Sequence, residues 1–380
     1  MATGEINVGL IGTKFMGKAH SNAYSTVGKF FDLPANPVLH SACGLDLQQV
    51  QALANKFGWQ YSETDYKKLL RSGEIDLIDI CTPNDFHSTI AVEAAKAGKH
   101  MVCEKPMARN ASEAIQMYRA AHESGVINMM IFNYRFVPAI ALAKKMIDNG
   151  KLGDIRHFNA VYYQDWLVDP SFPITWRHSK EISGSGSHGD MNAHTVDLAR
   201  YLVGEFEAVT GDQRVFVKER PILGSNKKGD VNADDATSFI ARFQNGAMGS
   251  FCATRMATGR KNFMRFELFG SKGSLSFNLE RINELEYFDG MAAEDRQGFT
   301  TILVTEASHS YIESWWPPGH VIGWEHTFVH EISHLLTGIG QNKKVAPDFF
   351  DGVKCQIVLD AVARSSEDGK WITIEEFYRE

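Results

Sequence analysis

The first third of the chain alternates short apolar runs with amphipathic segments. Short apolar runs bounded by turn residues predict buried strands, and apolar residues every three or four positions predict helices. The expected strands are Ile6 to Ile11, Val38 to Gly44, Leu77 to Cys81, Lys99 to Cys103 and Asn128 to Ile131. After the turn Gly12 to Gly17, the expected helices are one through Ala23, then Gln48 to Phe57, Tyr66 to Leu70, Ser88 to Ala97 and Ala111 to Ser124. This alternation predicts an α/β Rossmann domain, a parallel sheet with helices on both faces, over residues 1–135.

The pattern changes after residue 135, where strands follow one another with short turns between them. A helix is expected at Ala139 to Asn149, an aromatic-rich strand at Arg156 to Trp166 and a helix at Ser187 to Val203. The strands that follow are Val209 to Val217, Thr237 to Phe243, Ala247 to Thr254, Phe263 to Phe269, Gly273 to Asn278 and Glu284 to Tyr287, and the last helices are Trp324 to Ile339 and Phe350 to Ser365. Short turns imply antiparallel hairpins, so residues 136–380 are predicted to form an α+β domain with a mostly antiparallel open sheet. Pro221 to Asp230 is expected to be a mobile polar loop.

Composition narrows the classes of partner. The 380 residues are 44% hydrophobic, as in ordinary globular proteins, and carry a net charge of −7, which gives no electrostatic footprint for nucleic acid. No apolar run is long enough to span a membrane, and the start MATGEINVGLIG lacks the layout of a signal peptide. The five cysteines are scattered without a C-x-x-C pair, which favours reduced thiols. We therefore expect a cytoplasmic protein with no nucleic-acid or membrane partner.

Two motifs carry candidate chemistry. The strand that ends at Cys103 is followed by Glu104, Lys105 and a proline that cannot continue it. Ligands of open parallel sheets bind beyond the carboxyl ends of the strands, where the Lys105 ammonium could hold a cofactor hydroxyl and a substrate hydroxyl. A solvated surface lysine is the alternative. Far downstream, Asp190 and His194 are spaced i and i+4, so they share a helix face and complete a proton-transfer set.

These motifs together resemble the Gfo/Idh/MocA oxidoreductases. The resemblance rests on E-K-P after a strand and G-D-x-x-x-H-x-x-D-L on a later helix, and it runs from Ile6 to about Ile374. It implies an NAD(P)-dependent dehydrogenase of sugars, sugar derivatives or cyclic polyols. A homo-oligomer, dimer or tetramer, is expected through the second-domain sheet. The segments Q-D-W (164–166), W-R-H (176–178) and W-W-P-P-G-H (315–320) also resemble the levoglucosan and glycoside 3-dehydrogenase branch of this family.

The turn Gly12-Thr13-Lys14-Phe15-Met16-Gly17 is expected to bind the pyrophosphate of the cofactor. Lys14 occupies the middle-glycine position of the G-x-G-x-x-G fingerprint, so the match is imperfect. The context supports it nonetheless, because a strand precedes the turn and a helix follows it, as phosphate binding requires. Lys14 could supply charge in place of close backbone, whereas a plain strand-turn-helix remains the alternative.

The end of the second strand favours NAD over NADP. An acid at this position accepts a hydrogen bond from the adenine ribose and repels a 2′-phosphate. The family often carries that acid where Gly44 stands here, and Asp46 lies two positions later. Leu45 is not the arginine that usually marks NADP. We therefore predict NAD, with Asp46 reaching the ribose.

The resemblance also implies further site residues. The implied cofactor residues are Thr82, Pro83, Asn84, His87, Glu104, Lys105, Asn133, Trp176 and Arg177. The expected substrate residues are Lys105, Tyr134, Gln164, Asp165, Trp166, Asp190, Asn192 and His194. The strand end from Tyr162 to Trp166 combines rings with amide and carboxylate groups, as carbohydrate sites do, although an ordinary edge strand is also rich in aromatic residues.

The predicted reaction is oxidation of a secondary hydroxyl. Histidine has an unperturbed pKa of about 6.5, which suits proton transfer near neutrality, so His194 would take the hydroxyl proton. Lys105 would bind the reacting oxygen, and Asp190 would orient His194 or bind a neighbouring hydroxyl. Three alternatives remain: NAD-dependent glycoside hydrolysis, a non-catalytic NAD-sensing regulator, and zinc hydrolysis. The last rests on His330-Glu331-Ile332-Ser333-His334, which matches H-E-x-x-H. No third ligand is evident, so we expect no metal.

Overall fold

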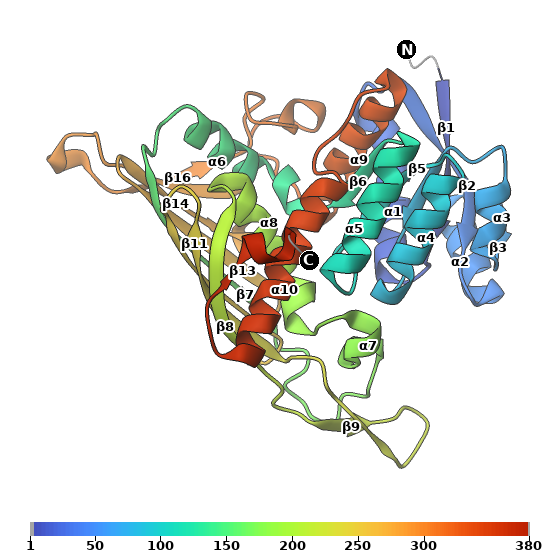
Figure 1. Ribbon diagram of the computed structural model, residues 1–380. Helices are drawn as coiled ribbons and strands as arrows, with labels where there is room; N and C mark the ends of the chain where they lie inside the picture. Colours follow the sequence, from blue (N-terminus) through green and yellow to red (C-terminus); the bar gives the residue numbers. More distant parts are fainter. Residues whose placement is uncertain (1–3, 379–380) are drawn as a thin grey trace. The chain divides into compact units, whose positions relative to one another are not determined.

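The computed structural model describes residues 4–378, which form two compact units (Figure 1). The first unit comprises the residues up to Ala108, Ser112–Phe136 and Gly323–Val353, and the second comprises Arg109–Ala111, Val137–Ile322 and the residues from Lys354. The change of unit at Phe136 lies one residue from the predicted boundary. The segment Gly323–Val353 was expected in the second domain but belongs to the first unit, because its helix α9 (Trp324–Gln341) packs on α1 (Phe15–Phe30).

The first unit is built on a six-stranded parallel sheet in the order β3-β2-β1-β4-β5-β6. Its strands are β1 (Gly4–Ile11), β2 (Ala35–Cys43), β3 (Tyr61–Glu63), β4 (Leu77–Ile80), β5 (His100–Glu104) and β6 (Asn128–Ile131). The central strands are mostly apolar on both faces, since helices cover both sides of such a sheet; Asp79 of β4 and Glu104 of β5 are buried exceptions. The strand order reverses between β1 and β4, and ligands of open α/β sheets bind at the carboxyl ends beside such a reversal.

Helices flank this sheet close to where the apolar periodicity predicts them. They are α1, α2 (Leu47–Phe57), α3 (Tyr66–Arg71), α4 (Asn84–Lys96), α5 (Ala111–Ser124) and α9. Helix α1 continues seven residues beyond the expected end at Ala23, because Tyr24 and Val27 extend its buried face to Phe30. The side chains of Asp46 and Asp65 cap α2 and α3 by accepting backbone N–H groups.

The second unit contains a nine-stranded mixed sheet in the order β16-β15-β14-β13-β7-β12-β11-β8-β17. Its strands are β7 (Ile155–Tyr163), β8 (Phe206–Arg214), β11 (Ala236–Phe243), β12 (Met248–Thr254), β13 (Phe263–Gly270), β14 (Gly273–Asn278), β15 (Glu284–Asp289), β16 (Phe299–Leu303) and β17 (Ile372–Thr373). Every neighbouring pair is antiparallel except β7 and β12. The predicted fold class, a Rossmann domain followed by an α+β domain with a mostly antiparallel sheet, is confirmed.

The helices of the second unit are α6 (Pro138–Asp148), the short α7 (Lys180–Ser183), α8 (Ala193–Leu202) and most of α10 (Phe349–Asp368). Helices α6 and α8 pack against one face of the sheet. Nearly every residue of α8 is buried, so its position is set by packing on all sides.

Three local predictions differ from the structure. The expected loop Pro221 to Asp230 contains the hairpin of β9 (Glu219–Pro221) and β10 (Lys228–Asp230). The long strand expected to reach Trp166 ends at Tyr163. The expected helix from Ser187 is divided into a π-helix, His188–Asn192, and α8.

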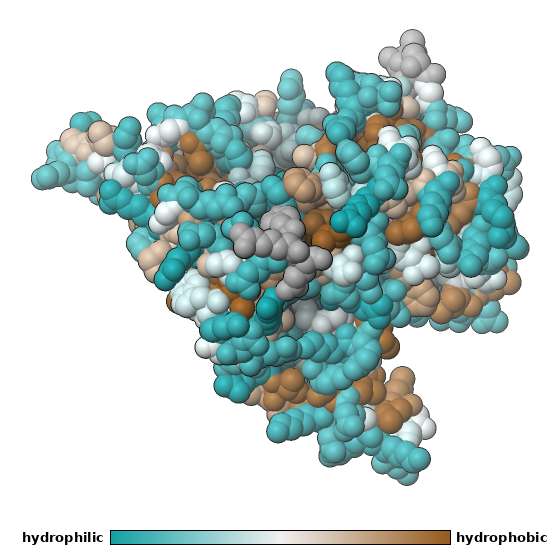
Figure 2. Space-filling model, in the orientation of Figure 1, coloured by the Kyte–Doolittle hydropathy of each residue, from teal (hydrophilic) through white to brown (hydrophobic). Residues whose placement is uncertain are grey.

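Polar and charged side chains cover most of the face seen in Figure 2, and apolar side chains gather near the β9–β10 hairpin. Phe216, Ile222 and Leu223 are exposed in this part of the chain. Within residues 4–378, none of the helices combines the length and the apolar composition needed to cross a bilayer.

Candidate active site

The turn after β1 has the backbone geometry of a dinucleotide-binding turn. Gly12 has a φ of +115°, and a Cβ added there would lie 2.3 Å from the carbonyl oxygen of Cys81. A Cβ on Gly17 would lie 2.0 Å from the carbonyl oxygen of Gly12. Both positions therefore require glycine, as the first and last positions of the fingerprint do. Helix α1 begins at Phe15, directly after Lys14, so its amino-terminal N–H groups lie at the turn.

The end of β2 shows why Gly44 departs from the family pattern. A Cβ added to Gly44 would lie 3.1 Å from Cγ2 of Thr13 and 3.2 Å from Cγ2 of Val50. The Thr13 side chain therefore occupies the space beside the position where the family often carries an acid. A larger residue at this position would displace Thr13 from the turn.

Asp46 has a structural task that the sequence analysis did not anticipate. Its Oδ1 accepts the backbone N–H groups of Gln48 and Gln49, at 2.9 and 3.2 Å, and its Oδ2 accepts from Gln49 Nε2 at 2.8 Å. The backbone bond from Gln49 contributes most to lowering the pKa of Asp46. Lys14 donates to the other end of the same Gln49 amide. Asp46 is thus an ionised and exposed helix cap, and binding of the ribose would be an additional role.

Thr82 follows the carboxyl end of β4 and carries a buried hydroxyl without a protein partner among the described residues. Buried hydroxyl groups normally have hydrogen-bond partners, so a buried hydroxyl without one indicates that a bound ligand supplies the partner. The glycine cradle, the amino terminus of α1 and this hydroxyl together fit a dinucleotide cofactor.

His87 positions this strand end instead of presenting a nitrogen to a ligand. It is fully buried, its Nε2 lies 3.0 Å from the carbonyl oxygen of Thr82, and its Nδ1 lies 3.1 Å from that of Pro106. Burial lowers the pKa of the imidazole. The ring therefore links the segment after β4 to the segment after β5. Pro83 and Asn84 lie at the start of α4, the helix that connects these two strands in the sequence.

Glu104, the last residue of β5, is also committed to protein partners. It is only 4% exposed. Its Oε1 accepts a hydrogen bond from Nε2 of His20 at 3.0 Å, and its Oε2 accepts the backbone N–H of Lys105 at 3.1 Å. Glu104 thus has a structural role at this strand end, and its predicted contact with the cofactor remains a prediction. Lys105, the next residue, is partly exposed just beyond the strand.

The last strand of the first unit leads to two further predicted residues. Asn133 is buried and donates from Nδ2 to Oγ1 of Thr327 at 2.8 Å, and Tyr134 is 3% exposed. Thr327 belongs to α9, whose first residue, Trp324, stacks on Phe15 at 5.4 Å between ring centroids. Asn133 thus joins the end of β6 to α9. The predicted contacts of Asn133 with the cofactor and of Tyr134 with the substrate remain predictions.

In the second unit, Asp190 is held by a cation that the sequence analysis missed. Nη2 of Arg255 donates to Oδ2 of Asp190 at 2.8 Å, and Arg255 is only 2% exposed. The guanidinium carbon of Arg255 lies 5.3 Å from the ring centroid of Trp166. A buried guanidinium favours the ionised form of a paired carboxylate, so Asp190 is suited to accept hydrogen bonds and unsuited to act as the base.

Arg177 lies in the same electrostatic environment. Burial lowers the pKa of its guanidinium, Asp190 opposes that shift, and Arg255 reinforces it. Its guanidinium carbon lies 4.3 Å from the ring centroid of Trp176. The predicted W-R pair therefore forms a local stack near the carboxylate of Asp190, and its contact with the nicotinamide remains a prediction.

His194 and Asp190 do not lie on one regular α-helix. Asp190 belongs to the π-helix and His194 to the first turn of α8, so the simple i, i+4 argument is modified by the wider turn. His194 is 7% exposed, and its ring centroid lies 6.0 Å from that of Tyr162 on β7. π-Helical turns are frequent at functional sites, which agrees with the assignment of this segment.

The start of this helical segment is held by Asp234, which no local pattern indicates. Its carboxylate accepts the N–H groups of Gly186 and His188, at 2.6 and 2.8 Å, and the hydroxyl of Ser187 at 2.6 Å. Asn192, predicted to bind substrate, is completely buried and bonds to His188 and Thr195. The amide of Asn192 is thus used inside the helical segment, and its predicted contact with a substrate remains a prediction.

The strand end after β7 forms an ordered polar network. Asn262 Oδ1 accepts from the hydroxyl of Tyr162 at 2.9 Å and from Nε2 of Gln164 at 2.8 Å. Gln164 Oε1 in turn accepts from Nε1 of Trp166 at 2.8 Å. Gln164 therefore fixes the orientation of the Trp166 ring. Asn262 could not be found from the sequence, because it lies on a different strand connection.

The side chain of Asp165 is not part of this network and bonds to the connection between β12 and β13 instead. Its carboxylate pairs with Nζ of Lys261 at 2.7 Å and accepts the N–H of Gly259 at 3.1 Å. The hydrogen bond from Lys261 contributes most to lowering the pKa of Asp165. Asp165 thus anchors the connection between β12 and β13, and any contact with a substrate would be additional.

The H-E-x-x-H motif contributes to the fold. Nδ1 of His330 lies 2.8 Å from the carbonyl oxygen of Phe136, and burial lowers the pKa of this imidazole to about 3. Oε1 of Glu331 accepts the N–H of Phe132 at 2.9 Å. These bonds join α9 to the end of β6. The side chains of His330 and Glu331 therefore bond to the backbone, whereas a zinc-peptidase site would need both side chains for the metal and its water.

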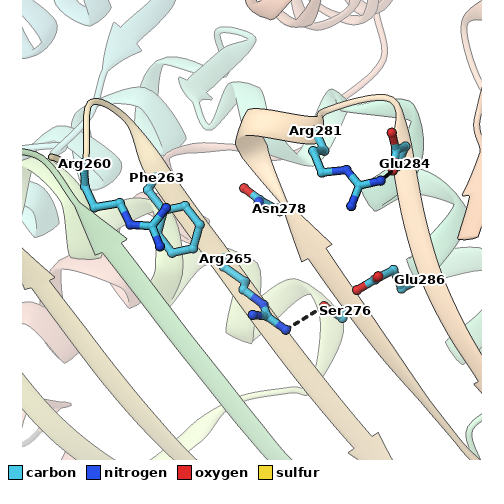
Figure 3. Close-up of a pocket in the computed structure, with 8 residues that line it drawn as sticks. All are labelled: Arg260, Phe263, Arg265, Ser276, Asn278, Arg281, Glu284 and Glu286. Atoms are coloured by element: carbon cyan, nitrogen blue, oxygen red, sulfur yellow. Dashed lines mark hydrogen bonds and ion pairs between the residues drawn. The ribbon is translucent and has the colours of Figure 1, made fainter. Parts of the chain in front are cut away.

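A separate hollow of about 350 Å³ lies on the sheet of the second unit (Figure 3). Apart from one phenylalanine, it is lined by charged and polar side chains of β13, β14, β15 and their connections: Arg260, Phe263, Arg265, Ser276, Asn278, Arg281, Glu284 and Glu286. None of the predicted site residues lines it, so this hollow is distinct from the candidate active site.

Comparisons with known proteins identify the family of this chain. Residues 6–132 match the oxidoreductase family with an NAD-binding Rossmann fold, and residues 140–276 match the GFO/IDH/MocA C-terminal domain. The levoglucosan dehydrogenase of Pseudarthrobacter phenanthrenivorans is 41% identical over 97% of this chain and 98% of that protein. The chain belongs to the Gfo/Idh/MocA oxidoreductase family.

Solved structures support the same family assignment. A levoglucosan dehydrogenase in complex with NADH aligns with a TM-score of 0.95 and 42% identity, over 97% of this chain and 99% of that one. An oxidoreductase domain protein from Kribbella flavida aligns with a TM-score of 0.95 and 46% identity, over 98% and 100% of the two chains. This Gfo/Idh/MocA protein is therefore an oxidoreductase that uses NAD, which confirms the cofactor predicted from the end of the second strand.

Proposed function

We propose that this protein oxidises a secondary hydroxyl of a sugar, glycoside, anhydrosugar or cyclic polyol to a ketone, with NAD as the oxidant. The observation that carries the proposal is the pairing of Asp190 with buried Arg255 beside the helix that presents His194. This arrangement offers two chemical roles, because the Asp190 carboxylate pairs with a cation and the nearby imidazole of His194 can accept a proton. A hydroxyl-bearing substrate needs both an acceptor and a proton-accepting base.

The chemistry assigns one role to each residue. His194 accepts the proton of the reacting hydroxyl, because imidazole is suited to proton transfer near neutral pH. Asp190 accepts a hydrogen bond from a neighbouring hydroxyl, and Lys105 donates one to the reacting oxygen. NAD, when bound, accepts the hydride from the carbon. Loss of one hydride and one proton converts the secondary alcohol to a ketone, so the step balances.

The first unit contributes the parts that would hold NAD. Gly12 and Gly17 allow the backbone approach to the pyrophosphate, and the amino terminus of α1 supplies N–H groups. The Thr82 hydroxyl is available for a bond to the cofactor. Asp46 is ionised at the end of the turn after β2, which favours a ribose hydroxyl over a 2′-phosphate.

The relatives suggest which substrates to test first. Levoglucosan dehydrogenase is the relative with 41% identity, and the inositol 2-dehydrogenase of Rhizobium meliloti is 26% identical over 97% of this chain and 99% of that protein. The ring of Trp166, fixed by Gln164, offers an apolar face of the kind that packs against pyranose rings. We therefore propose an anhydrosugar such as levoglucosan as the first candidate.

The test is an incubation of the purified protein with NAD and a panel that contains levoglucosan, methyl glucosides, free hexoses and inositols. Formation of reduced cofactor together with a ketone product, identified by NMR, is the expected result. Release of a free sugar from a glycoside without net cofactor reduction would instead indicate NAD-dependent hydrolysis. Absence of both products over the whole panel would refute the proposed function.

A further inference from the structure

His20 on α1 is completely buried, and each of its ring nitrogens faces a carboxylate. Nδ1 lies 2.8 Å from Oδ2 of Asp79 on β4, and Nε2 lies 3.0 Å from Oε1 of Glu104 on β5. A neutral imidazole has only one N–H group, so donation to both carboxylates requires the imidazolium form. Burial alone would lower the pKa of His20, but Asp79 opposes it and the pKa stands well above the ordinary value.

The same network continues to the backbone of Lys105. The second oxygen of Glu104 accepts the Lys105 N–H at 3.1 Å, so both carboxylate oxygens have defined donors. On the other side, the thiol of Cys81 donates to Oδ1 of Asp79 at 3.3 Å. The chain of bonds therefore runs from β4, through the α1 histidine, to the residue that follows β5.

We propose that His20 is a positioning residue for Lys105, because its imidazolium holds the Glu104 carboxylate that binds the Lys105 backbone. The proposal rests on the role given to Lys105 in the proposed function. Burial of three charged groups is costly, and buried ion triads can often be replaced by apolar residues without loss of stability. The triad of His20, Asp79 and Glu104 is therefore better explained by holding the end of β5 in place than by adding to the stability of the fold.

A metal site at the same place is less consistent with the geometry. His20, Asp79 and Cys81 have ligand atoms within 4.8 Å of one another, which is the spacing of a metal-binding cluster. Their atoms, however, already satisfy one another: Nδ1 of His20 bonds Asp79 at 2.8 Å, and the Cys81 thiol bonds the same carboxylate. The proton on Nδ1 thus takes the place that a cation would need.

The experiment compares His20→Gln with His40→Gln in the full-length protein. Glutamine has no charge and cannot donate to both carboxylates. His40 is a matched control, since it is a largely buried histidine of the same unit whose Nδ1 lies 2.9 Å from Oγ of Ser41. Hydrogen exchange of the segment with Glu104 and Lys105 reports the positioning without any need for catalysis.

In His20→Gln we expect exchange at the Lys105 amide to rise roughly tenfold over the control, while the rest of the first unit is little changed. We also expect kcat to fall on the order of 10²-fold, as for a displaced catalytic group, with the Kd of NAD little changed. Unchanged exchange at Lys105 would overturn the proposal. So would a uniform rise over the whole first unit, because His20 would then only stabilise the fold.

A second variant, Glu104→Gln, tests the link itself. It keeps the shape of the side chain but removes the charge that His20 binds. If His20 acts through Glu104, the double variant should lose little more kcat than either single variant. Fully additive losses would contradict the proposal. If the wild-type protein oxidises no substrate, the proposed function fails, and the exchange comparison still decides whether His20 positions Lys105.

Discussion

Removal of the Asp234 carboxylate should loosen the helix that carries the second-unit site residues. Asp234 accepts the N–H groups of Gly186 and His188 from 48 and 46 residues away in the sequence. Both of these donors belong to buried residues. Asp234→Ala would leave two buried N–H groups without this acceptor, at about 1–3 kcal/mol each, so we expect a loss of about 2–6 kcal/mol in the free energy of unfolding.

The assay is chemical denaturation, with kcat and the Kd of NAD measured on the folded variants. Asp234→Asn keeps one carbonyl oxygen and should lose about half as much stability as the alanine variant. Asp289→Asn is the control, because the partners of this exposed carboxylate, the N–H of Met291 and the side chain of Tyr287, lie within two residues of it, and its effect should stay within about 0.5 kcal/mol.

We expect Asp234→Ala to lower kcat, because Asp190 and His194 follow the capped turn. The Kd of NAD should not change, since the NAD-binding turn belongs to the first unit. A loss of less than about 1 kcal/mol, or no more than in the Asp289 control, would refute the reasoning, because at least one buried N–H would then be satisfied without Asp234.

Four further outcomes follow from the site. Fluorescence quenching should give a lower Kd for NAD than for NADP, because Asp46 is ionised; tighter NADP binding would contradict this. EDTA should leave activity intact, whereas loss that zinc restores would show that His330 and His334 bind metal. Arg255→Met should reduce kcat/KM by freeing Asp190 from its cation, and unchanged kinetics would exclude that role. In the unfolded chain His330 takes up a proton below about pH 6.5, whereas in the folded protein it stays neutral down to a pKa of about 3. Its contribution to the free energy of unfolding is therefore present above pH 6.5 and is lost as the pH falls from 6.5 towards 3. His330→Gln should reduce the slope of this free energy against pH by up to about 1.4 kcal/mol per pH unit, and an unchanged slope would contradict the assignment.

The fold could be predicted where one segment determines its own structure. The buried runs of β1, β4 and β5 are mostly apolar on both faces, and their spacing reveals the Rossmann alternation. By contrast, β16 is exposed along most of its length, so it lacks the alternation that identifies a half-buried strand. The unit to which α9 belongs also depends on its tertiary contact with α1, which no local pattern reveals.

The same distinction applies to the site. Lys105, Asp190 and His194 are candidates that local motifs predict, because each motif combines a strand end or helix with a chemical group. Arg255 was missed because its position depends on the parallel pairing of β12 with β7, which brings Thr254 beside Tyr163. Such long-range pairings create the partners of catalytic groups, and a single sequence does not show them.

The π-helix is a further feature that spacing could not reveal. Asp190 and His194 have the i, i+4 spacing of neighbours on an α-helix, and the motif was recognised for that reason. The observed turn is wider, and Asp234 holds its start from another part of the chain. The prediction that Asp190 and His194 share the face of one regular α-helix is therefore modified, because their geometry depends on a π-helical turn and on a cap that is distant in sequence.

The central claim is that His194 is the base for oxidation of a secondary hydroxyl. The most direct measurement is kcat with NAD and the best substrate of the panel for the wild type, His194→Ala and the control His157→Ala, an exposed histidine of β7. We predict that His194→Ala lowers kcat by about 10²- to 10⁴-fold while the Kd of NAD is unchanged, and that His157→Ala matches the wild type. Retention of most of the kcat by His194→Ala, with an unchanged pH profile, would contradict the claim and place the base elsewhere.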